Sequence, residues 1–130
     1  MNYGIQMYSL RDITGTDLEG ALAAVAEMGY QNVEFAGFFG HSAEEVRAML
    51  DRHHLAVSGT HSGLGELTGN FAETVKYHKT IGNTQFIIPG HDLSTRAKLD
   101  EFIDACNELA PKLHARRLFT KVPVVNRIKV

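Results

Sequence analysis

The sequence lacks the features of secreted and membrane proteins. A single cysteine, Cys106, occurs among 130 residues, so no disulfide can form within the chain. No apolar run approaches the roughly 18 residues of a membrane helix, and the first residues lack the basic and apolar regions of a secretion signal. Apolar residues make up 44% of the chain, which argues against disorder. These observations predict a globular, cytoplasmic protein with no membrane partner.

Several catalytic and binding motifs are also missing. There is no H-E-x-x-H, no paired-cysteine zinc motif and no G-x-S-x-G elbow. The turn after the first apolar run reads Tyr8-Ser9-Leu10-Arg11-Asp12 and has no glycine-rich phosphate loop. The sequence therefore gives no sign of a zinc peptidase, an α/β-hydrolase or a nucleotide-binding domain.

Negative charge is missing from the end of the chain. Residues 1–111 hold seven basic and all fifteen acidic residues, a net charge of −8. Residues 112–130 hold six basic residues and no acidic one, a net charge of +6. A basic tail of this kind is a nucleic-acid or membrane-surface arm, a solvated terminus or a stretch foreign to the preceding domain.

Short apolar runs alternate with helical patterns along the chain. Strands are predicted at residues 4–8, 32–36, 56–60 and 85–88, whose starts are separated by 28, 24 and 29 residues. The predicted helices begin near Asp17, Ser42, Asn70 and Ser94, each with a capping side chain, and we expect Pro111 to end or kink the last one. Their apolar faces are predicted from residues at helical spacing: Leu18, Leu22, Val25, Met28, Val46, Met49, Leu50, Phe71, Val75, His78, Ile81, Leu99, Phe102, Ile103, Cys106 and Leu109.

Four successive βα units predict an α/β fold with a parallel sheet. Two architectures satisfy this pattern, an open doubly wound sheet and part of a (β/α)8 TIM barrel. The missing glycine-rich turn favours the barrel. A complete barrel needs about 250 residues, so the chain accounts for about four of its βα units.

Candidate functional residues gather at the carboxyl ends of the predicted strands, where ligands bind in both architectures. His61 leaves a strand directly into a glycine-containing loop, where an imidazole can bind a metal or transfer a proton. The alternative is a histidine bonded to nearby backbone. Glu34 lies inside an apolar strand, so it faces a polar cavity or pairs with a cation such as Arg11. Tyr8 and His91 complete this rim.

Three segments resemble a known family. YGIQMYSLRD (residues 3–12) is similar to the opening strand and loop of the sugar phosphate isomerase/epimerase proteins. AVAEMGYQNVEF (residues 24–35) resembles their first helix and second strand, and Thr60-His61-Ser62 ends the third strand. These proteins belong to the xylose isomerase-like TIM barrels, which include endonuclease IV. The resemblance covers roughly residues 3–110, the N-terminal half of such a barrel.

The resemblance implies metal-assisted proton transfer next to a carbonyl of a small sugar or polyol. It assigns catalysis to Glu34 and His61 and substrate binding to Tyr8, Arg11 and His91. It also implies a divalent metal (Mn, Mg or Zn), whose full ligand set is absent from this chain. In the endonuclease branch, histidines after the third and fourth strands bind zinc, which in this sequence points to His61 and His91.

The tail departs from the family pattern. We expect a half-barrel over residues 1–111 and a basic tail over residues 112–130, with one strand-like stretch at residues 122–125. A truncated or frame-shifted coding sequence explains both the charge switch and the missing later strands, so we expect a catalytically incomplete enzyme. The open sheet edges predict a homodimer.

Two other functions fit parts of the sequence. One is a non-catalytic βα module that binds a polyol or a metal. The other is an endonuclease IV-like nucleic-acid protein, which the net charge of −8 over residues 1–111 opposes.

Overall fold

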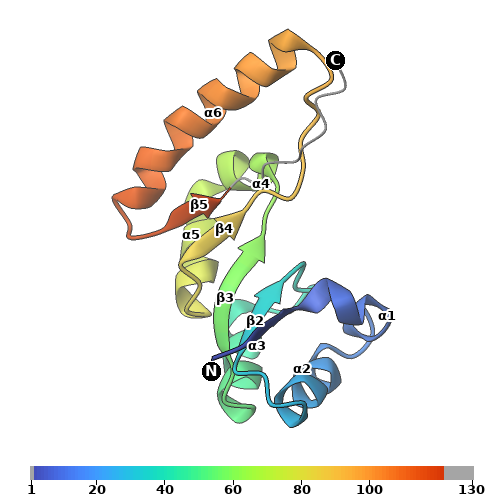
Figure 1. Cartoon of the computed structure of the whole chain (residues 1–130). Helices are drawn as coiled ribbons and strands as arrows, with labels where there is room; N and C mark the ends of the chain where they lie inside the picture. Colours follow the sequence, from blue (N-terminus) through green and yellow to red (C-terminus); the bar gives the residue numbers. More distant parts are fainter. Residues whose placement is uncertain (1, 122–130) are drawn as a thin grey trace.

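Five parallel strands form one open sheet whose spatial order, β1-β2-β3-β4-β5, follows the sequence (Figure 1). The computed structural model describes residues 2–121. The strands are β1 (Gly4–Gln6), β2 (Asn32–Phe35), β3 (Ala56–His61), β4 (Gln85–Ile87) and β5 (Phe119–Lys121). In a doubly wound sheet, the order in which the strands are added would reverse part-way across the sheet. The order found here confirms the barrel-type arrangement that the sequence predicts.

Helices connect the strands and cover the outer side of the sheet. They are the 3-10 helix η1 (Met7–Leu10), α1 (Arg11–Thr14), α2 (Leu18–Glu27), α3 (Ala43–Arg52), α4 (Leu64–Gly69), α5 (Phe71–Thr80) and α6 (Arg96–His114). None of the helices within residues 2–121 combines the length and the apolar character that crossing a bilayer requires.

Two of the predicted helix starts are capped as expected. The Asp17 carboxylate accepts the backbone N–H of Gly20 at 2.8 Å at the start of α2. At α3, the Ser42 hydroxyl accepts the Glu45 N–H at 3.2 Å, and the Glu45 carboxylate accepts the Ser42 N–H at 2.7 Å. The bonds from Ser42 lower the pKa of Glu45. This reciprocal capping box fixes where α3 begins.

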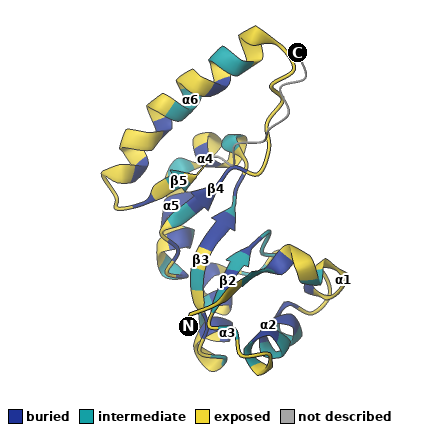
Figure 2. Cartoon of the chain, viewed as in Figure 1, coloured by how far each residue is buried: buried dark blue, intermediate teal, exposed yellow. Residues whose placement is uncertain are grey.

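The core lies between the sheet and its helices, in two clusters. The first packs α2 and α3 against the first three strands, and its buried members include Leu22, Val25, Val33, Phe35, Val46 and Leu50. The second packs α4, α5 and α6 against β4, with Leu67, Val75, Phe86, Ile88, Phe102, Leu109 and Leu113. Figure 2 shows that most of the surface of α6 is exposed, because α6 contributes only one buried stripe. Each fully buried side chain of this size stabilises the fold by about 1.5–3 kcal/mol.

The structure differs from the sequence-based expectation at several places. The helix expected to end or kink at Pro111 continues to His114, and Met28, expected in the core, is 65% exposed beyond the end of α2. The helix α4 and the strand β5 were not predicted. The boundary placed after residue 111 falls inside α6, and the described residues beyond it complete that helix and form β5. The strand-like stretch at residues 122–125 lies outside the described residues.

Candidate functional site

Three polar side chains share the inner face of the sheet, opposite the helices. Gln6 is paired in register with Glu34 across β1 and β2, so both side chains lie on the same face. His61 ends β3 and contacts both of them. Because the strands are parallel, all three residues lie at the carboxyl end of the sheet. This is the edge at which the sequence predicts the site.

An irregularity in the pairing of β2 with β3 brings Glu34 and His61 together. The register shifts between Val33 and Glu34, so Glu34 lies opposite Gly59. A Cβ atom at Gly59 would lie 2.6 Å from Ile87 Cδ1 and 3.7 Å from Glu34 Oε2. The glycine therefore gives room to the Ile87 side chain, while the Glu34 carboxylate passes at ordinary contact distance and reaches the next inner-face residue of β3, His61.

The site centres on the Nε2 atom of His61. His61 Nε2 lies 3.0 Å from Glu34 Oε1 and 3.0 Å from Gln6 Nε2. A single nitrogen cannot donate to Glu34 and accept from Gln6 at the same time. The imidazole therefore has two bonded states: Nε2–H donates to Glu34, or bare Nε2 accepts from the Gln6 amide. The side chains of His61 and Glu34 are 23% and 31% exposed, so a ligand can reach both.

Tyr8 and Arg11 follow the carboxyl end of β1, on η1 and at the start of α1. The Arg11 guanidinium stacks on the Tyr8 ring, 5.0 Å from its centre, and donates to the Tyr8 carbonyl at 3.3 Å. The proposed pairing of Arg11 with Glu34 is wrong, because Glu34 bonds His61 instead. Both rim side chains are exposed, as residues that receive a ligand need to be.

His91 does not join the other candidates. It lies on the exposed loop after β4, and its ring stacks on Phe102 of α6 with centroids 4.7 Å apart. Within residues 2–121, no hydrogen bond or ion pair connects it to Glu34 or His61. The charged residue beside it, Asp92, bonds Lys98, which holds the pKa of the Asp92 carboxyl well below its usual range.

Two inner-face residues were missed by the sequence analysis. Gln6 is a polar amide residue in an otherwise apolar strand. Its position in that strand is the sequence feature that could have identified it as a site residue. Lys121 is paired in register with Ile87, which is paired with His61, so it lies on the same face. Lys121 belongs to a strand that the sequence analysis did not predict, and it was therefore counted only as part of the basic tail.

The described residues do not form a metal site on their own. Glu34 and His61 provide two donor groups, and no cluster of three His, Cys, Asp or Glu side chains within residues 2–121 is arranged to hold an ion. A catalytic zinc takes three protein ligands and a water. Within residues 2–121, Glu34 and His61 therefore provide fewer ligands than such a zinc centre takes.

Comparison with known proteins rests on structure alone. No family model and no curated protein matches the sequence. A sugar phosphate isomerase/epimerase from Parabacteroides distasonis superposes with a TM-score of 0.77 at 16% identity, over 93% of this chain and 50% of that chain. An AP endonuclease of family 2 from Brucella melitensis gives 0.69 at 16% identity, over 94% and 55%. The IolI protein with a bound zinc atom gives 0.68 at 13% identity, over 94% and 51%.

This chain has the fold of half a xylose isomerase-like TIM barrel. It spans about half the length of the solved structures that it matches. In this half-barrel, the face that carries Gln6, Glu34 and His61 corresponds to the interior of the closed barrel. The site therefore lies at the end of the barrel where enzymes of this architecture place their catalytic groups.

Proposed function

We propose that the half-barrel belongs to a sugar isomerase/epimerase-like enzyme that acts on a small sugar or polyol. The observation that carries the proposal is the 3.0 Å contact between Glu34 Oε1 and His61 Nε2 on the inner face of the sheet. A carboxylate and an imidazole at this distance can exchange a proton, and both remain partly open to a ligand.

Glu34 is the proposed base. Its Oε2 atom, which His61 leaves free, takes a proton from the carbon next to the substrate carbonyl. The C–H electron pair forms a C=C bond as the carbonyl π electrons move to oxygen, which gives an enediolate. Return of the proton to the neighbouring carbon, with transfer of the hydroxyl proton to the first oxygen, gives an isomer, whereas an epimer requires proton delivery to the same carbon from the opposite face. His61 donates Nε2–H to Glu34 in the resting pair, which holds the carboxylate in one orientation.

The Gln6 amide is proposed to hold the imidazole during this cycle. His61 keeps its Nε2 proton while Glu34 Oε2 takes and returns the substrate proton, and the Gln6 side chain, 3.0 Å from Nε2, restrains the ring. The ring therefore keeps its place in both protonation states of Glu34. Such fixed geometry lowers the reorganisation that accompanies proton transfer.

Tyr8 and Arg11 are the proposed substrate-binding residues. Their stacked side chains form an exposed cationic and aromatic surface next to the inner face. An anionic or hydroxyl-rich substrate can bond the guanidinium while its ring lies against Tyr8. His91 would have to leave the Phe102 ring to reach the same ligand, so substrate binding in this proposal rests on the other two residues.

A closed site needs more than the five described strands. The inner face of an open sheet admits water, which weakens the electrostatic stabilisation of an enediolate. β1 and β5 are the open edges through which a second copy of the chain would pair. Because β5 adds a fifth strand, two copies would contribute ten strands, more than the eight of a TIM barrel.

A chimeric enzyme tests the role of the Glu34–His61 pair. Residues 2–121 are fused to the C-terminal half of the Parabacteroides distasonis protein, and deuterium uptake from D₂O into a ketose phosphate is followed by NMR. We expect Glu34→Gln to lower the exchange rate by about 10²–10⁴-fold. Glu27→Gln, an exposed carboxylate at the end of α2, is the matched control and should leave the rate unchanged.

The same experiment separates the alternative functions. A folded chimera whose exchange rate is insensitive to Glu34→Gln would refute the assignment of the base. Ketose phosphate binding without exchange would favour a non-catalytic polyol-binding module. An endonuclease-like role has the Brucella melitensis structure in its favour, but the acidic balance of residues 1–111 opposes phosphate-backbone binding.

A further inference from the structure

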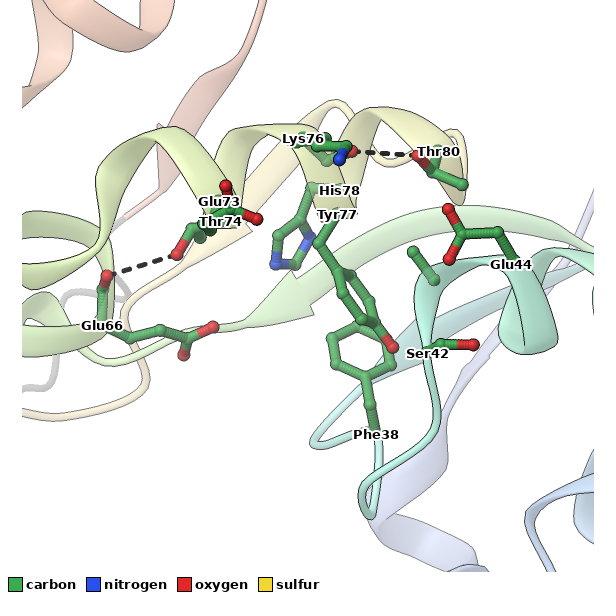
Figure 3. A pocket seen from close by; sticks show the side chains of 11 residues that line it. Phe38, Ser42, Glu44, Glu66, Glu73, Thr74, Lys76, Tyr77, His78 and Thr80 are labelled. Atoms are coloured by element: carbon green, nitrogen blue, oxygen red, sulfur yellow. Dashed lines mark hydrogen bonds between the residues drawn. The ribbon is translucent and has the colours of Figure 1, made fainter.

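A cavity of about 420 Å³ lies on the helical side of the sheet, away from the Glu34–His61 pair. It is bordered by α3, α4, α5 and the loop that precedes α3. The residues that matter for its chemistry are Phe38, Glu44, Glu66, Glu73, Tyr77 and His78. Figure 3 shows the His78 imidazole projecting into the space between Glu66 and Tyr77. A space of this volume accommodates a small organic molecule.

The hydrogen bonds around His78 determine which ring nitrogen carries its proton. The Gln85 backbone N–H donates to Asn83 Oδ1 at 3.1 Å, which fixes the orientation of that amide. Asn83 Nδ2 therefore faces His78 Nδ1, also at 3.1 Å, and donates to it. Nδ1 is the acceptor, so the proton of the neutral imidazole is on Nε2.

The Nε2–H group of His78 has no acceptor within residues 2–121. His78 is only 1% exposed, yet it lines the cavity. Because Nδ1 is already bonded, Nε2–H is the ring donor that a ligand in the cavity can reach. A ligand atom that accepts a hydrogen bond, such as a hydroxyl oxygen, fits this donor.

The rest of the cavity lining is acidic and aromatic. Glu44, Glu66 and Glu73 come from three different helices, and Lys76 is the only lysine or arginine among the lining residues. Burial raises the pKa of Tyr77 to about 12, and the negative charges of Glu45 and Glu44 add to this effect. The same negative potential favours a cation in the cavity. The Phe38 and Tyr77 rings, with centroids 4.7 Å apart, give that cation an aromatic wall.

We propose that this cavity binds a hydroxylated amine, such as an amino sugar or an amino alcohol. The ammonium group pairs with the carboxylates, and a neighbouring hydroxyl oxygen accepts the Nε2–H of His78. The apolar edge of the ligand lies against Phe38 and Tyr77. The inference does not depend on the chemistry of Glu34 and His61, because the two sites lie on opposite faces of β3.

Calorimetric titration of the full chain with D-glucosamine tests the proposal, and D-glucose serves as the uncharged analogue. We expect glucosamine to bind at least about tenfold more tightly than glucose, since a partly buried ion pair supplies about 1.4 kcal/mol or more. Glu66→Gln should weaken glucosamine binding by about tenfold. Glu101→Gln, an exposed carboxylate on α6, is the matched control and should not change it.

A second readout addresses the hydroxyl contact. The ¹⁵N signal of His78 Nε2 should shift when glucosamine binds, and n-propylamine, which has the ammonium but no hydroxyl, should leave it in place. The proposal is overturned if glucosamine does not bind at millimolar concentration, if glucose binds equally well, or if Glu66→Gln binds as the parent does. Thermal unfolding of each variant confirms that its fold is intact.

Discussion

Acidification should destabilise this protein through one buried histidine. His78 packs against Phe86 with ring centroids 4.5 Å apart, and its Nδ1 accepts from Asn83. Desolvation by burial lowers the pKa of His78 from its usual 6.5 to about 4. The unfolded chain therefore binds a proton at a pH where the native protein still excludes it. Stability is fully present above pH 6.5 and declines as the pH falls towards 4.

The size of the effect follows from the difference in pKa. Each pKa unit corresponds to about 1.4 kcal/mol, so the drop from 6.5 to about 4 removes about 3 kcal/mol from the free energy of unfolding by the time the pH reaches 4. That is a large part of the 5–15 kcal/mol by which a typical small domain is stable.

Urea unfolding at a series of pH values measures this contribution. The variant His78→Gln keeps an acceptor for Asn83 but removes the titrating ring. It should be less stable than the parent at neutral pH, and the difference should shrink by about 3 kcal/mol as the pH falls to 4. His54→Asn is the control, because His54 is exposed and asparagine tolerates its positive φ of 55°. Parallel curves for the parent and His78→Gln would refute the reasoning.

Four further predictions follow from the cap, the sheet and the open barrel. Ser42→Ala removes the capping box of α3 and should lower the free energy of unfolding by about 1 kcal/mol, whereas Ser42→Thr should retain most of it. Gly59→Ala places a Cβ atom 2.6 Å from Ile87 Cδ1, the movable end of that side chain, so it should destabilise the fold by about 1 kcal/mol or less, and a larger fall in the urea midpoint would show that Ile87 cannot shift. The chain alone should show negligible turnover of ketoses and inososes with or without Mn²⁺ or Mg²⁺, so metal-dependent turnover that is lost in His61→Ala would contradict this expectation. Sedimentation at micromolar concentration should give a dimer or larger species, and a well-behaved monomer would count against pairing through the open edges.

The repeating part of the fold was predictable because local and long-range signals agree there. Strands β2, β3 and β4 lie within a residue of their predicted bounds, and the caps at Asp17 and Ser42 mark the starts of α2 and α3. Apolar spacing, capping residues and glycine stops each point to the same boundaries. The parallel order then follows, since each strand must be connected to the next by a crossover helix.

The elements that were missed carry little local signal. β5 consists of Phe119, Thr120 and Lys121 at the edge of the sheet, and its residues do not form an apolar run. This strand forms by pairing with the edge of β4, to which the chain returns after α6. α4 has glycine at two of its six positions and a third glycine, Gly63, at its N-cap, which is a poor helix composition. Its buried Leu67 anchors it in the second core cluster.

The location of the candidate site was predictable from the sequence, but the contacts between its side chains were not. Sequence alone places Glu34 and His61 at the same edge of a parallel sheet, but which side chain meets which depends on register, and register is a tertiary property. The shift opposite Gly59 decides the outcome: it turns the Glu34 carboxylate towards His61, and Arg11 stacks on Tyr8 instead.

The alternation of β3 explains why this half-barrel carries two separate polar sites. Thr60 and His61 are neighbours in sequence, yet their side chains point to opposite faces of the sheet. Thr60 contacts His78 in the helical layer, where the imidazole borders the cavity, is almost fully buried and has its pKa lowered by desolvation. His61 meets Glu34 on the inner face, where both side chains remain partly exposed. The same side chain type is therefore kept from titrating at neutral pH on one face and left open to a ligand on the other.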